Sequence, residues 1–165
     1  MSGYYYTLVT IHVLAALVWL GGMFFLGLVG APVLRRVEPP VLRQQLFNEL
    51  GVRFRTVGWI AIAALATTGT LMLRVRGLLH WEGVLGDPDF WATTAGTALG
   101  VKLAAVLFML TVSFVHDFIH GPAASRAIPG SRAAAAMRRR ASVLARVNAL
   151  VGLVLLLAAV RLARG

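Results

Sequence analysis

The feature that most restricts how this sequence can fold is a long apolar stretch near its start. From Leu8 to Leu34 there is no Asp, Glu, Lys or Arg, and a helix crosses a bilayer with about 20 apolar residues at ~1.5 Å rise each. The stretch carries a single ionisable side chain, that of His12. Polar groups are costly inside a membrane and usually face a bundle interior or a binding site. His12 is therefore the first candidate functional residue.

Composition extends this argument to the whole chain. Of its 165 residues, 59% are hydrophobic and 13% are charged, which is typical of an integral membrane protein. We predict an all-α fold with one membrane domain over residues 1–165, a four-helix up-down bundle. The predicted transmembrane helices span about 4–34, 56–73, 90–120 and 143–163. An amphipathic segment at about 41–50 is expected to lie along the membrane surface.

The basic residues predict the orientation of the bundle. The net charge is +10, and ten of the sixteen basic residues lie in segments 31–55 and 121–142. The positive-inside rule places both segments in the cytoplasm and both termini on the outer side. We therefore expect a multi-pass protein of the cell (inner) membrane with lipid as its partner, and no nucleic-acid binding. The first six residues carry no basic group, so no cleaved signal peptide is expected.

His12 and Lys102 lie at similar predicted depths. Counting ~1.5 Å per residue puts both in the outer half of the bundle, on different helices. Lys102 is the only lysine of the chain. Such a pair is compatible with a metal ion, a haem iron or a proton path, and also with simple hydrogen bonding inside the bundle.

Other residues complete this predicted outer cluster. On the first helix, small and aromatic side chains share the face of His12 and leave room for a flat ligand. Threonines of the second helix, Thr68 among them, lie at the same depth. His80 becomes a second ligand if the outer loop folds over the mouth of the bundle. The residues selected as cofactor lining are Ala16, Trp19, Thr67 and Thr70.

A second group of polar residues lies near the other end of the bundle. His116 and His120 are four residues apart and share a helix face, so with His12 they are candidate metal ligands. Solvation or contact with lipid headgroups is the alternative. The sequence between them lacks the glutamate of a His-Glu-x-x-His metalloprotease. The cysteine count is zero, so thiolate ligands are excluded, and the membrane methionines are interpreted as packing residues.

Small residues on the third helix suggest a contact with another helix. Gly96 and Gly100 form a Gly-x-x-x-Gly motif, which lets helices approach closely. We predict that this face packs against a second copy or a membrane partner.

Several motifs resemble known membrane families. The run from His12 to Phe25, followed by Gly-Ala-Pro-Val-Leu-Arg-Arg at 30–36, resembles the opening of copper-resistance D (CopD-like) domains. Three further motifs resemble both this family and the HemJ-like protoporphyrinogen oxidases: Phe54-Arg55, Thr68-Gly69 and Gly100-Val101-Lys102-Leu103.

The resemblance implies two functions. In the HemJ-like oxidases a first-helix His and a third-helix Lys are associated with haem b, which carries over to His12 and Lys102. CopD-like domains are associated with copper uptake. Our leading hypothesis is haem b in the outer half of the bundle, with His12 as axial ligand, Lys102 or His80 as its partner, and an electron-transfer or oxidase role. The alternatives are a copper permease with His and Met ligands, and a structural membrane subunit.

Overall fold

The computed structural model describes residues 3–79 and 84–163, and the regular elements in these ranges are all helical. Four helices are long and apolar enough to cross a membrane: Gly3–Leu34, Pro40–Val75, Thr94–Arg126 and Arg132–Ala159. The prediction of an all-helical fold with four helices able to span a membrane is confirmed, and the up-down arrangement with both termini on the outer side stays a prediction.

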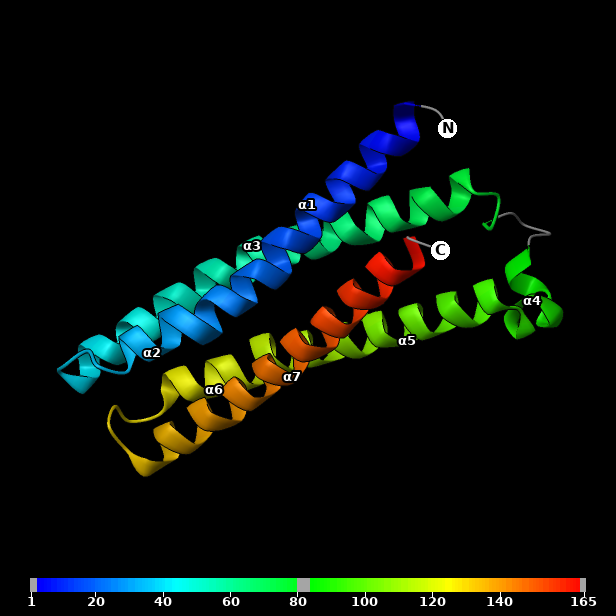
Figure 1. Cartoon of the computed structure of the whole chain (residues 1–165). Helices are drawn as coiled ribbons and strands as arrows, with labels where there is room; N and C mark the ends of the chain where they lie inside the picture. The colour runs from blue at the N-terminus through cyan, green and yellow to red at the C-terminus, as the bar shows by residue number, and fades with distance from the viewer. Residues whose placement is uncertain (1–2, 80–83, 164–165) are drawn as a thin grey trace.

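The long helices contain shorter elements. In chain order the elements are α1 (Gly3–Phe25), the π-helical turn η1 (Leu26–Gly30), α2 (Ala31–Leu34), α3 (Pro40–Val75), the short 3₁₀ turn η2 (Val84–Gly86), α4 (Pro88–Ala92), α5 (Thr94–Phe114), the π-helical turn η3 (Val115–His120), α6 (Gly121–Arg126) and α7 (Arg132–Ala163). Figure 1 shows that α1 begins and α7 ends at the same end of the molecule as α4, whereas α2 and α6 lie at the other end.

Local chemistry explains where several helices begin and end. At the start of α5, the Thr93 hydroxyl accepts a hydrogen bond from the N–H of Gly96 at 3.0 Å. Ser131 caps α7 in the same way, accepting from Ala134 at 3.1 Å. Both side chains satisfy an N–H that the first helical turn leaves unpaired. After α3, Gly77 has a φ of 72°, a conformation that favours glycine.

The third long helix passes through a proline. The predicted span ends at about residue 120, just before Gly121 and Pro122, but the helix continues through α6 to Arg126. A π-helical turn comes first, in which the N–H of Gly121 donates to the carbonyl of His116. Proline lacks an N–H and clashes with the preceding turn, and the wider π turn relieves that conflict. The same arrangement precedes Pro32.

The helices of the structure also extend beyond other predicted spans. The segment at about 41–50 is the first part of α3, continuous with the apolar span, and the last helix begins at Arg132 rather than near residue 143. Arginine is a good helix former, so the end of an apolar run does not end a helix. The third span is divided at Thr93, whose backbone is extended. The position of 41–50 relative to the membrane stays a prediction.

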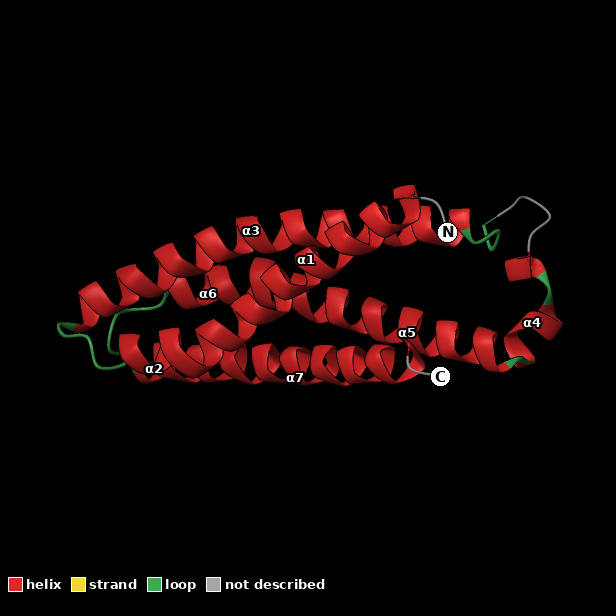
Figure 2. Cartoon of the chain, turned by 45° about the horizontal axis from the view of Figure 1, so that its top comes forward, coloured by secondary structure: helices red, strands yellow, loops and turns green. Residues whose placement is uncertain are grey.

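The helices pack as two pairs. Helix α1 runs along α3, and α5 runs along α7. The pairs meet through α1 with α7, and through α6 with α3. Towards the end that carries α4, the two pairs diverge in both views (Figures 1 and 2).

Glycines bring α1 and α3 close together. A Cβ built on Gly58 would lie 3.7 Å from Cδ1 of Trp19, and one on Gly69 would lie 3.5 Å from Cε1 of His12. Gly58 and Gly69 of α3 therefore each lie directly against a ring of α1. Small residues permit such close packing of membrane helices, and here they set the position of His12.

The glycines of α5 have neighbours within the chain. Gly96 is buried against the backbone of Phe90 and Trp91, and a Cβ on Gly100 would lie 3.5 Å from the Trp91 ring. The face of α5 that carries these two glycines thus packs against α4. Packing of a second copy or a partner on this face stays a prediction.

We expect Gly96→Ala to destabilise the protein by about 1–3 kcal/mol, because the added methyl group would collide with the backbone carbonyl of Phe90. Thermal unfolding in detergent measures the change. Gly21→Ala is the matched control, since nothing lies within 4 Å of that position. It should be neutral or stabilise the helix by up to about 1 kcal/mol. Equal losses in both variants would contradict the close contact.

Candidate functional site

His12 is held on α1 by a threonine of α3. Its Nδ1 lies 2.8 Å from Oγ1 of Thr68, whose side chain is buried. The Thr68 hydroxyl also lies 2.6 Å from the carbonyl oxygen of Ala64. A hydroxyl has one hydrogen to donate, and the carbonyl can only accept. The Thr68 hydroxyl therefore donates to Ala64 and accepts from His12.

This network assigns the tautomer of the His12 side chain. Nδ1 carries the proton, so the neutral imidazole presents a lone pair at Nε2. Within the described residues, the hydrogen bonds leave Nε2 without a partner. Metal-binding histidines typically donate one ring N–H to a protein acceptor and bind the metal through the other nitrogen. His12 has this arrangement.

The other residues of the predicted outer cluster differ in how they lie relative to His12. Ala16 and Trp19 are half-buried on the same helix as His12, and Trp19 packs on Gly58. Thr67 and Thr70 are exposed, and the structure brings Thr68 to the imidazole in their place. Thr68 faces α1 because of the rotation of α3, which depth alone does not reveal.

Lys102 is not joined to His12. It is exposed on α5, and α5 packs along α7 rather than along α1. No hydrogen bond or ion pair of the described residues links the two side chains. His80 lies outside the described residues.

Asp117 is the centre of a polar network at the other end of the bundle. The indole N–H of Trp59 donates to its Oδ2 at 2.9 Å, and Nδ1 of His116 lies 2.8 Å from its Oδ1. Arg55 donates to the backbone carbonyl of Asp117 at 3.2 Å and lies over the ring of Phe118. The carboxylate thus orients His116 as Thr68 orients His12. Sequence reasoning missed Trp59, although it is one turn from Arg55 on α3.

His116 and His120 have different surroundings. His116 turns to Asp117, whereas His120 lines a pocket with residues of α7. Across residues 3–79 and 84–163, no three side chains of the His, Asp or Glu type gather in a way that could hold a metal ion. The histidines are therefore candidate metal ligands at separate positions along the bundle.

A buried amide joins three helices between these two sites. The Nδ2 group of Asn148 on α7 donates to Oγ of Ser113 on α5 at 2.8 Å and lies 3.7 Å from the sulfur of Met23 on α1. Asn148 is only 2% exposed. One turn further along α7, Gly152 lies against Met109. Two thioethers therefore lie beside the centre of α7.

Comparison with known proteins gives a family match. A family model described as Copper resistance protein D matches residues 49–162. The chain is also 32% identical over 111 residues to an uncharacterized protein of Aquifex aeolicus (strain VF5); the alignment covers 67% of this chain and 66%, slightly less than two thirds, of that protein. No solved structure matches. The matched region includes Thr68 and His116 and begins after His12.

We expect Ser113 and Asn148 to stabilise the bundle cooperatively. A double-mutant cycle with Ser113→Ala and Asn148→Ala should give a coupling energy of about 0.6–1.7 kcal/mol, the range of hydrogen bonds between membrane helices. Unfolding in mixed micelles, followed by circular dichroism, provides the four free energies. Thr111→Ala is the control partner, since its exposed hydroxyl bonds to its own helix at Leu107. A coupling near zero for Ser113 would contradict the assigned bond.

Proposed function

The chain belongs to the copper resistance protein D family, and from this premise we propose that it binds copper(I) at His12 and passes the ion along the helix bundle across the membrane. The family description favours this copper hypothesis over the haem b hypothesis. The expected second haem ligand was Lys102 or His80; Lys102 is exposed on α5, and His80 lies outside the described residues.

The observation that carries the proposal is the free Nε2 of His12. Thr68 fixes the opposite ring nitrogen, so the imidazole is oriented before any ion arrives. Imidazole nitrogen and thioether sulfur are suitable ligands for copper, and thioethers favour copper(I). An ion that must leave again needs donors that bind it weakly and in succession.

Met23 and His116 provide further metal ligands along the bundle after His12. Met23 lies on the same helix as His12, eleven residues further on, or about 16 Å at ~1.5 Å per residue. His116 follows towards the other end, with its Nδ1 at Asp117. We assign His12 to entry, Met23 to the middle of the path and His116 to exit.

The direction of transport follows from the distribution of charge. We place the bundle in the inner membrane as an up-down arrangement, with basic segments 31–55 and 121–142 in the cytoplasm. His12 is then near the outer side and His116 near the cytoplasm. The resulting direction of transport is from the outer side to the cytoplasm, which is copper uptake.

We expect His12→Ala to abolish copper binding by the purified protein. The full chain is loaded with copper(I) in detergent, dialysed, and analysed by elemental mass spectrometry. Wild-type protein should retain copper, and the variant should not. If His12→Ala retained as much copper as the wild-type protein, the proposal would be wrong. A Soret band without copper would instead assign the same imidazole to haem b.

A pair of adjacent threonines tests the orientation of the imidazole. Thr68→Val removes the acceptor of His12 and should weaken copper affinity by about 10–100-fold, the usual effect of losing the partner of a metal-binding histidine. Thr67→Val is the matched control, because Thr67 is exposed and not bonded to His12. Competition with a copper(I) indicator gives both affinities. Equal affinities for the two variants would contradict the role of Thr68.

We expect Asp117→Asn to slow transport without removing copper from His12. The amide keeps the shape of the carboxylate but is a weaker acceptor for His116, so copper uptake into proteoliposomes should fall by about 10–100-fold. Glu49→Gln is the control, since Glu49 forms an exposed ion pair with Arg53 at 2.8 Å. Unchanged uptake in Asp117→Asn would remove His116 from the path.

A further inference from the structure

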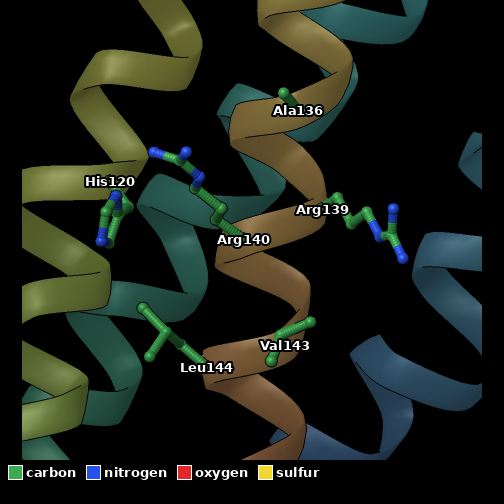
Figure 3. A pocket seen from close by; sticks show the side chains of 6 residues that line it. All are labelled: His120, Ala136, Arg139, Arg140, Val143 and Leu144. Atoms are coloured by element: carbon green, nitrogen blue, oxygen red, sulfur yellow. The ribbon is translucent and has the colours of Figure 1, made fainter.

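A basic pocket lies between α7 and the turn that carries His120. Its volume is about 590 Å³, and its lining residues are His120, Ala136, Arg139, Arg140, Val143 and Leu144. Figure 3 shows Arg140 reaching from α7 towards the helix of His120, with Leu144 on the same side of α7 and Arg139 extending on the other. The small side chain of Ala136 leaves the polar end of the pocket open.

The positive charge of this pocket is not compensated by the protein. No acidic residue lines it. The ion pairs among the described residues involve Glu38, Glu49 and Asp117, and none includes Arg139 or Arg140. Both guanidinium groups attract an anion to this end of α7. Arginine forms forked hydrogen bonds that match phosphate geometry.

The other end of the pocket is apolar. Val143 is half exposed and lies with Leu144 one turn further along α7, where the charge-rich start of the helix gives way to its apolar span. The pocket has about twenty times the ~30 Å³ that a water molecule occupies in the liquid, so it is much larger than a free phosphate ion. A cationic end joined to an apolar wall matches the junction of a phospholipid headgroup with its acyl chains.

We propose that this pocket binds the phosphate of an anionic phospholipid. Arg140 and His120 contact the headgroup from two sides, and Val143 and Leu144 pack against the first part of an acyl chain. The lipid then joins α7 to the third long helix at the end where α6 and α7 meet. This site is separate from the proposed copper path at His12.

Native mass spectrometry of the detergent-solubilised full chain tests the proposal, with phosphatidylglycerol and phosphatidylcholine as probes. Wild-type protein should retain one phosphatidylglycerol in preference to phosphatidylcholine. Arg140→Ala should weaken that retention about fivefold, the usual effect of one basic residue at an anionic membrane. Arg126→Ala, which removes the same charge from an exposed position outside the pocket, should retain the lipid as wild type does.

A second measurement needs no variant. The melting temperature of wild-type protein should rise more with phosphatidylglycerol than with phosphatidylcholine, because the lipid binds only the folded pocket. Equal retention and equal melting shifts with the two lipids would overturn the proposal. Equal weakening by Arg126→Ala and Arg140→Ala would show general attraction to anionic lipid instead of a site. Displacement of the lipid by an equal concentration of inorganic phosphate would assign the pocket to free phosphate.

Discussion

A polar side chain inside a membrane bundle needs a partner from the protein, because the surrounding hydrocarbon offers none. His12 on α1 pairs with Thr68 on α3, and Asn148 on α7 pairs with Ser113 on α5. Asp117 likewise accepts from the opposite helix pair. The hydrogen bonds that these groups make also join the helices, so the same bonds hold the bundle together and orient its polar side chains.

The contact of α1 with α3 shows how packing prepares a site. Gly58 and Gly69 let the rings of Trp19 and His12 lie directly on α3. At this distance the Thr68 hydroxyl reaches Nδ1 of His12 and leaves Nε2 free. A Cβ at Gly69 would lie in ordinary van der Waals contact with the imidazole, so a side chain larger than alanine there would crowd the His12 ring. Small residues on α3 thus determine what a histidine on α1 can bind.

Basic residues contribute in two distinct ways. Arg53 is paired with Glu49 on an exposed face, and exposed pairs of this kind contribute little to stability. Arg139 and Arg140 have no such partner among the described residues, and they border a pocket with an apolar wall. The same charges that predict orientation in the membrane therefore also provide the chemistry for binding an anionic lipid.

The sequence by itself determined the class of the protein and its four apolar helices, because an unbroken apolar run of about 20 residues satisfies its backbone in hydrocarbon as a helix. It also identified His12, since one ionisable group stands out in an apolar run. It could not choose among threonines at equal depth, and only the rotation of α3 selects Thr68. It placed Lys102 at the depth of His12, and the packing of α1 along α3 makes Thr68 the hydrogen-bond partner of the imidazole. Depth follows from counting residues along one helix, but contact depends on how two helices pack, which is a tertiary property.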